Sequence, residues 1–262
     1  MRPVLALLTD FGSRDHYAGA MKGVMLAICP DATLVDITHD VPPHDVLAGA
    51  LELAAVYKYF PAGTIFIAVV DPGVGSGRRA IAADTGDYRF VAPDNGLLTL
   101  VLRETPAKKI VELTERRYAR PTVSRTFEGR DRFAPAGAWL AKGIQLSALG
   151  RPLPDVQRLD IPAPVPGPDR ITGTVLRVDR FGNLVTNIDR KLVERLAQGS
   201  PLTIDAGGRR VERLVATYAE LPPDGVGALF GSTDHLELAA PSASAAERLG
   251  LTRGATVTVL RT

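Results

Sequence analysis

The chain has 262 residues, of which 45% are hydrophobic and 23% charged, a composition typical of a globular protein with one large or two ordinary domains. Its 31 basic and 29 acidic residues are scattered and leave a net charge of +2, which argues against a nucleic-acid partner. The single cysteine, Cys29, excludes an internal disulfide and fits a reducing compartment. No apolar span is long enough for a membrane helix, and we see no signal peptide, so we expect a cytoplasmic protein.

Strand and helix patterns alternate over residues 1–160. The β-branched apolar run Thr64–Val70 is typical of a strand covered on both faces. Asp45 is placed to cap a helix that ends before Pro61. Further strands are expected at Val4–Asp10, Thr33–Thr38, Arg79–Ala83, Tyr88–Ala92 and Lys109–Leu113, and helices at Asp15–Ile28 and Asp131–Leu149. The alternation predicts an N-terminal α/β domain with a largely parallel central sheet.

The composition changes at residues 161–168, which contain four prolines in eight residues. Such a segment favours extended geometry, so we interpret it as a semi-rigid linker. The remainder, 169–262, predicts a smaller C-terminal β-rich domain, with a barrel as the favoured architecture. Its strands are expected at Ile171–Val178, Leu184–Ile188, Leu202–Ile204, Arg210–Val215, His235–Leu238 and Thr256–Leu260, with short helices at Arg190–Ala197 and Ala243–Leu249.

The most informative segment is Val69–Arg79, in which an apolar strand ends at Asp71 and a glycine-rich loop leads to Arg78. Three glycines allow backbone angles that other residues resist, so the loop is able to fold Arg78 back toward Asp71. In isolation the segment has two interpretations. One is a charged reaction centre at the end of a strand, and the other is a capped turn with solvated arginines.

Acidic and polar side chains follow several predicted strands, at Asp10, His39-Asp40, Asp71 and Asp94-Asn95. Ligands of open parallel sheets bind beyond the carboxyl ends of the strands. An acidic rim there suits a ligand that is cationic or rich in hydroxyl groups. None of the spacings is typical of a metal site, since His39 and His44 flank a Pro-Pro turn and have no cysteine partner.

The C-terminal half carries its own marked segment, Asp179–Asn187. In one interpretation Asp179 and Asn183 stabilise a hairpin turn in which Gly182 takes a positive φ. In the other, Asp179 and Asn183 bind a ligand. The segment alone favours neither interpretation.

Taken together, the motifs resemble those of the S-adenosylmethionine (SAM) hydrolases, also called SAM hydroxide adenosyltransferases, which share a fold with fluorinases and chlorinases. The motifs occur in the same order along the whole chain, and the predicted domain boundary lies between the last motif and the one before it. The matching segments are Leu8–Gly12, Asp15–Gly23, Asp36–His39, Val70–Gly75, Ala92–Gly96, Thr126–Pro135 and Asp179–Asn183.

The resemblance implies an N-terminal α/β domain and a C-terminal β-barrel. It further implies a homotrimer whose active sites lie between the N-terminal domain of one subunit and the C-terminal domain of the next. The implied reaction is attack of water or hydroxide on C5′ of SAM, giving adenosine and L-methionine without a cofactor. The implied substrate-binding residues are Asp10, Asp15, Asp179, Asn183 and Ser232.

The family's catalytic group is an aspartate, an arginine seven residues later and a histidine. Asp71 and Arg78 match the first two, whereas the histidine position is Glu128 here. Arg78 would hold the attacking water and its developing hydroxide, while Asp71 orients the water or accepts a proton. Glu128 has two interpretations: it replaces the histidine as a base, or it only forms a salt bridge with Arg78 or Arg130. The segment after Ser232 also departs from the family and offers no arginine for the methionine carboxylate.

Two classes of function therefore remain open at this stage. The first is a SAM hydrolase that uses Asp71, Arg78 and Glu128. The second is a non-catalytic SAM- or adenosine-binding protein in which Glu128 marks lost chemistry. A SAM-dependent halogenase is less favoured, because carboxylates at Asp71 and Glu128 would repel a halide at short range.

Overall fold

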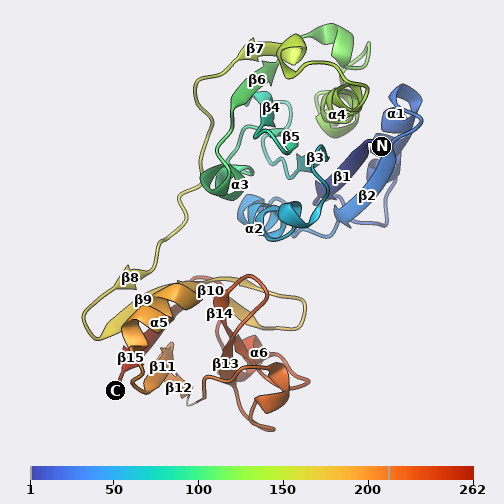
Figure 1. The fold of residues 1–262 in the computed structure, drawn as a ribbon. Coiled ribbons are helices and arrows are strands. Elements are labelled where there is room, and N and C mark those ends of the chain that lie inside the picture. The colour runs from blue at the N-terminus through green and yellow to red at the C-terminus, as the bar shows by residue number, and fades with distance from the viewer. Residues whose placement is uncertain (1, 212) are drawn as a thin grey trace. The chain divides into compact units, whose positions relative to one another are not determined.

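The computed structural model describes residues 2–211 and 213–262. The chain divides into two compact units, Met1–Leu159 and Asp160–Thr262 (Figure 1). Within the described residues, no helix is both long and apolar enough to cross a membrane.

The first unit is built around a seven-stranded sheet in the order β2-β1-β3-β5-β4-β6-β7. The strands are β1 (Val4–Thr9), β2 (Thr33–Thr38), β3 (Ile65–Val69), β4 (Ala80–Asp84), β5 (Arg89–Pro93), β6 (Lys109–Leu113) and β7 (Gly150–Pro152). β3 lies third in the order, between β1 and β5, and is completely buried, as its apolar sequence predicts. Asp71 therefore lies just beyond the end of a fully buried strand.

The sheet is mixed, so the prediction of a largely parallel sheet is wrong. The β1–β2, β1–β3 and β3–β5 pairs are parallel, whereas β4–β5, β4–β6 and β6–β7 are antiparallel. The physical reason is the short connection between β4 and β5, in which Gly86 has a φ of +105°. A connection this short forms a hairpin, since a parallel pair needs a crossover of a dozen or more residues.

Helices cover both faces of this sheet (Figure 1). On one face α4 packs so closely that a Cβ added to Gly137 would lie 2.7 Å from Ile67. On the other, a Cβ on Gly49 of α2 would lie 3.0 Å from Val70. The helices are α1 (Tyr17–Ile28), α2 (Val46–Val56), α3 (Thr99–Glu104) and α4 (Ala134–Ala141), with α1 beside α4 and α3 beside α2.

The predicted helix over 131–149 is a series of shorter elements. A π-helix, Gly129–Phe133, runs into α4, and a turn with Gly143 at φ +94° ends α4 before the 3-10 helix Leu146–Leu149. The predicted cap of α2 is confirmed, because Asp45 Oδ1 accepts a hydrogen bond from Ala48 N at 3.0 Å. Two further 3-10 helices occupy Tyr57–Tyr59 and Arg116–Tyr118.

The second unit is an antiparallel sheet with path order β12-β11-β15-β9-β10-β14-β13, to which β8 adds beside β9. Its elements are β8 (Val165–Pro166), β9 (Arg170–Val178), β10 (Leu184–Asp189), α5 (Arg190–Ala197), β11 (Leu202–Ala206), β12 (Arg209–Val211), the 3-10 helix Tyr218–Glu220, β13 (Gly227–Phe230), β14 (His235–Ala239), α6 (Ala245–Leu249) and β15 (Thr256–Arg261). Sequence patterns did not indicate β13. Position 212 of the strand expected at Arg210–Val215 lies outside the described residues.

This second sheet is nearly barrel-shaped. Leu214 forms an isolated bridge with Ala228 of β13, and Val215 N donates a hydrogen bond to Ala228 O at 2.8 Å. The segment that follows one edge strand, β12, thus lies beside the opposite edge strand, β13. β8 falls inside the proline-rich segment 161–168 and pairs with β9, so part of that segment belongs to the β-rich unit.

Candidate active site

A tight loop connects Asp71 to Arg78 and turns the arginine back onto the aspartate. Ser76 Oγ donates a hydrogen bond to Gly73 O at 2.6 Å and accepts one from Arg78 N at 3.2 Å. Gly75 has a φ of +77°, where glycine is strongly favoured. The prediction that this loop brings Arg78 to Asp71 is confirmed.

Arg78 bridges two carboxylates that come from distant parts of the sequence. Its Nε donates to Asp71 Oδ1 at 2.8 Å, and its terminal NH2 donates both to Asp71 Oδ2 and, at 2.6 Å, to Glu128 Oε2. The side chains are only 5% exposed at Asp71, 9% at Arg78 and 12% at Glu128, so water screens these charges weakly. We refer to Asp71, Arg78 and Glu128 as the charged cluster.

The charged cluster keeps its arginine firmly protonated. Burial by itself lowers the pKa of Arg78, but hydrogen bonds and charge attraction from Asp71 and then Glu128 outweigh it and raise the pKa above its ordinary value. The guanidinium also lies 5.1 Å from the ring centre of Phe133, which covers one side of it. A fixed positive charge is thus held between two carboxylates.

The Glu128 carboxylate forms ion pairs with two arginines, Arg78 and Arg132. Glu128 precedes the π-helix, and its Oε1 lies 3.5 Å from the guanidinium of Arg132 one turn later. Glu128 therefore forms the salt bridge with Arg78 that the second interpretation named and none with Arg130, while its role as a base is left untested. Arg132 was missed in the sequence, although its i+4 spacing from Glu128 on a helix was the available signal.

Arg130 pairs instead with the neighbouring Asp131. Arg130 Nε and NH2 donate to the two carboxylate oxygens at 2.7 and 2.8 Å, and Ser124 N donates at 2.9 Å. Asp131 is fully buried. Its burial by itself raises its pKa, but the hydrogen bonds from Arg130 and Ser124 outweigh that effect and lower the pKa below 3.8.

We expect this pair to stabilise the segment that carries Glu128, and to do so in a pH-dependent way. Because the pKa of Asp131 is lowered by folding, its stabilisation is present above the ordinary value of 3.8 and is lost as the pH falls below it. Asp131→Asn should reduce the free energy of unfolding at pH 7 by about 2–4 kcal/mol. Urea denaturation at pH 7 and near pH 3 measures this. The exposed Asp31→Asn is the control, and an equal deficit for Asp131→Asn at both pH values would contradict the assignment.

The loop and the segment before Glu128 touch at Gly75. A Cβ on Gly75 would overlap the carbonyl oxygen of Arg125, and Arg125 NH2 donates to Gly75 O at 3.2 Å. This close approach places the loop that carries Asp71 and Arg78 against the segment that leads to Glu128.

Gly75→Ala should therefore separate the two segments. We expect a loss of about 1–3 kcal/mol in the free energy of unfolding, from strain at positive φ and from the backbone overlap. Thermal and urea denaturation measure it. Gly77→Ala in the same loop is a matched control, since a Cβ there meets nothing within 4 Å. Equal stabilities of the two variants would refute this account.

The remaining polar residues of the rim have separate partners. Asp10 accepts a hydrogen bond from His44 N at 2.8 Å, while Asp15 is exposed just before α1. Asp94 is 4% exposed and accepts from Arg79 Nε at 2.7 Å, which indicates a structural role. Asn95 donates to Val70 O at 2.8 Å and so fixes the end of the strand that leads to Asp71.

His39 belongs to a hydrogen-bond network that no sequence pattern indicated. Its Nδ1 lies 2.8 Å from Thr9 Oγ1 and its Nε2 lies 3.0 Å from Asp36 Oδ1, while Lys22 Nζ donates to Asp36 at 2.6 Å. Burial by itself raises the pKa of Asp36, but Lys22 and His39 together lower it. His39 is thus held by neighbours at both of its ring nitrogens.

Three aromatic rings meet beside Gly129. Phe11 lies 5.9 Å from Phe127 and 5.8 Å from Tyr17, between ring centres. A Cβ on Gly129 would lie 3.3 Å from the Phe11 ring, so the small residue lets these rings approach the backbone that follows Glu128. Tyr17 is 40% exposed, which leaves part of this aromatic surface open to solvent.

In the second unit, Asp179 and Asn183 bond to each other across the turn between β9 and β10. Asp179 Oδ1 accepts from Asn183 N at 2.8 Å, and Asp179 Oδ2 accepts from Asn183 Nδ2 at 3.0 Å. Gly182 has a φ of +82°. The hairpin-turn interpretation is therefore confirmed, and it leaves a ligand-binding role untested. Ser232 is exposed in the turn before β14.

A further acidic group lies close to that turn. Glu237 is 7% exposed and accepts a hydrogen bond from Tyr218 OH at 2.9 Å. Burial, and to a lesser degree the charge of Asp179, raise its pKa. Burial and the bond to Glu237 raise the pKa of Tyr218 to about 12. No sequence pattern indicated Glu237.

The structure thus defines a two-part protein whose α/β unit presents a buried arginine between two carboxylates at a strand end. Among the described residues, no group of three or more His, Cys, Asp or Glu side chains is placed to hold a metal ion. Sequence models of the N- and C-terminal domains of SAM hydroxide adenosyltransferase match residues 5–150 and 173–258. The chain belongs to this family.

Relatives align with this chain over nearly its whole length. The (R)-S-adenosyl-L-methionine hydrolase of Thermus thermophilus is 39% identical and covers 99% of this chain and 100% of its own. That of Salinispora tropica is 39% identical over 96% and 95% of the two chains. A fluorinase from Actinoplanes is more distant, at 30% identity over 99% and 98%. An uncharacterised conserved protein from Thermotoga maritima has a solved structure with a TM-score of 0.93 and 34% identity, covering 98% of this chain and all of its own.

Proposed function

We propose that the protein is an enzyme that hydrolyses S-adenosyl-L-methionine to adenosine and L-methionine. The observation that carries the proposal is the charged cluster of Asp71, Arg78 and Glu128 in a chain of the SAM hydroxide adenosyltransferase family. The curated hydrolases at 37–39% identity support hydrolysis over non-catalytic binding. SAM is the substrate, and we propose that no cofactor is used.

In the proposed reaction a water oxygen forms a bond to C5′ of the adenosyl group as the C5′–sulfur bond breaks. The bonding electron pair goes to sulfur, which becomes the neutral thioether of methionine, so the leaving group needs no proton. The enzyme's tasks are to align the water behind C5′ and to remove its proton. Arg78 is positioned to stabilise the developing hydroxide, and Asp71 to orient the water.

Glu128 is proposed as the proton acceptor. Its Oε2 is occupied by Arg78 at 2.6 Å, but its Oε1 lies 3.5 Å from Arg132, beyond hydrogen-bond distance. One oxygen therefore remains available to accept a proton from water. The ion pair with Arg78 orients this carboxylate and does not remove it from the reaction.

Substrate binding is proposed for residues of both units. In the first, Asp10 and Asp15 are assigned to the ribose and the sulfonium side. In the second, Asp179 is assigned to the methionine ammonium, Asn183 to adenine and Ser232 to the amino-acid end. We further propose that the second domain, 169–262, is a β-barrel and that the segment 161–168 links it to the first domain, 1–160. We also propose that the protein is a homotrimer. A cytoplasmic location is proposed as well, which fits the free, buried Cys29.

The direct test is incubation of the purified protein with SAM, followed by chromatography of adenosine and methionine. Equal amounts of both products, formed faster than in a protein-free control, are expected. Saturable SAM binding without adenosine would establish the binding-protein alternative instead. The same reaction with added chloride should give no chloroadenosine, because the carboxylates of the charged cluster repel a halide.

A further inference from the structure

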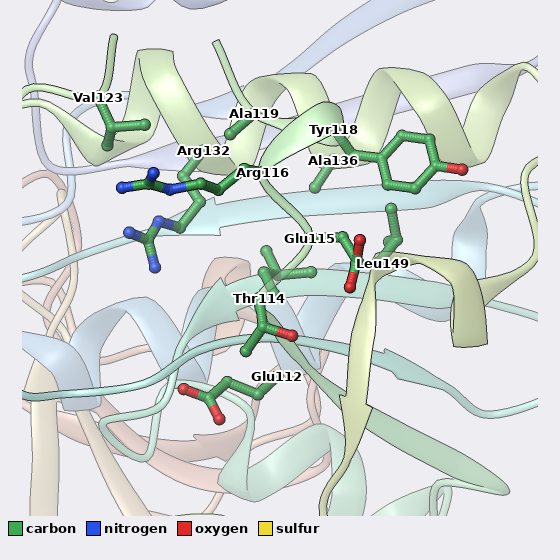
Figure 2. Close-up of a pocket in the computed structure, with 11 residues that line it drawn as sticks. Glu112, Thr114, Glu115, Arg116, Tyr118, Ala119, Val123, Arg132, Ala136 and Leu149 are labelled. Atoms are coloured by element: carbon green, nitrogen blue, oxygen red, sulfur yellow. The ribbon is translucent and has the colours of Figure 1, made fainter. Parts of the chain in front are cut away.

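A pocket of about 240 Å³ opens in the first unit where β6 meets the 3-10 helix Arg116–Tyr118 (Figure 2). None of the residues of the charged cluster lines it. The volume holds several water molecules but lies below the roughly 300–1,000 Å³ of pockets for drug-sized ligands. The pocket is therefore the right size for a small ligand.

Two arginine side chains lie at one end of this pocket and make it positively charged. Figure 2 shows the guanidinium groups of Arg116 and Arg132 turned toward the same region. Neither group donates a hydrogen bond to any residue within 2–211 and 213–262, and the only ion pair of the two is that of Arg132 with Glu128 at 3.5 Å. Each guanidinium has five N–H donors in a planar fork that matches carboxylate and phosphate oxygens.

The acidic residues of the lining lie away from this end and have other partners. Glu112 pairs with Arg151 at 2.8 Å, and Glu115 lies 3.9 Å from Arg117. Neither Arg151 nor Arg117 lines the pocket. Figure 2 shows both carboxylates apart from the two guanidinium groups. The positive charge at the arginine end is thus not neutralised from within the pocket.

We propose that this pocket binds a small phosphate-like oxyanion between Arg116 and Arg132. Arg132 is shared, because it faces both the pocket and Glu128 of the charged cluster. The oxyanion and Glu128 therefore compete for the same guanidinium. The proposed oxyanion site does not depend on the hydrolysis reaction proposed above, because it requires only that the pocket binds an anion.

Inorganic phosphate is the probe, and the single tryptophan provides the readout. Trp139 packs on Tyr118, a lining residue, with ring centres 5.7 Å apart. Phosphate should change Trp139 fluorescence saturably and raise the melting temperature, because a ligand of the folded state stabilises it. Sodium chloride at equal ionic strength should do neither. A wild-type response that does not saturate, or that chloride reproduces, overturns the proposal.

Two variants test the assignment of the arginines. Arg116→Gln should raise the dissociation constant for phosphate about tenfold or more, whereas Arg103→Gln, an exposed arginine of α3 outside the pocket, should leave it unchanged. Equal affinities of the two variants would place the anion elsewhere.

Glu128→Gln should tighten phosphate binding roughly two- to fivefold, because it removes the competitor for Arg132. This effect is measured by binding and not by hydrolysis, so it separates the pocket from the proposed reaction. Unchanged or weaker binding in Glu128→Gln refutes the sharing of Arg132.

Discussion

Arg78→Met is expected to reduce SAM hydrolysis at least about 100-fold and to destabilise the protein. The activity falls because the fixed charge that stabilises the developing hydroxide is lost. The stability falls by about 3–5 kcal/mol, because the carboxylates of Asp71 and Glu128, 5% and 12% exposed, are left facing each other without their shared cation. Product chromatography and urea denaturation measure the two effects.

These two losses have different physical origins, so they can be separated in one protein. The triple variant Asp71→Asn/Arg78→Met/Glu128→Gln carries no charge in the cluster and should recover most of the lost stability, because a neutral buried set avoids the unpaired-charge penalty. It should remain inactive. Recovery of hydrolysis along with stability would mean that Arg78 serves only the fold. Arg103→Gln, which removes an exposed arginine, controls for the change in net charge of the single variant Arg78→Met.

The central part of the site was predictable because its determinants are local. A carboxylate at the end of an apolar strand, followed by glycines and an arginine, predicts a loop in which Arg78 returns to Asp71, and it does so at 2.8 Å. The cap at Asp45 and the burial of β3 follow from similarly short patterns. In each case the sequence separation is small, so few alternative arrangements compete.

The remainder depended on contacts that no local pattern specifies. The meeting of Glu128 with Arg78, fifty residues earlier in the chain, was expected only through the resemblance to the family, and no spacing indicates the accompanying approach of the Arg125 backbone to Gly75. The sheet was predicted to be largely parallel because apolar strands have similar sequences in parallel and antiparallel sheets. The short link between β4 and β5 did, however, indicate an antiparallel pair. Arg132 was overlooked because the helix around it was predicted to begin at Asp131, whereas the helical segment begins at Gly129, directly after Glu128.

We expect Glu128→Gln to lower the rate of SAM hydrolysis by about 10²–10⁴-fold, because it removes the proposed proton acceptor. Glutamine keeps the size and accepts the hydrogen bond from Arg78, so the loop should stay closed while the proton acceptor is lost. The melting temperature should change little compared with this loss in rate. An unchanged rate and pH profile in Glu128→Gln would remove Glu128 as the base and leave Asp71 as the proton acceptor.

Glu128→His supplies the complementary test, since it introduces the histidine that the family carries at this position. A neutral imidazole loses the ion pairs that Glu128 makes with Arg78 and Arg132, at 2.6 and 3.5 Å, but remains a base at neutral pH. We expect hydrolysis well above that of Glu128→Gln, with a rate that falls as the pH drops below the ordinary histidine pKa of about 6.5. Glu194→Gln, on the exposed side of α5, controls for the lost charge. If glutamine and histidine variants were equally slow at pH 8, the carboxylate would be needed for its charge, and its role would be to hold Arg78 in place.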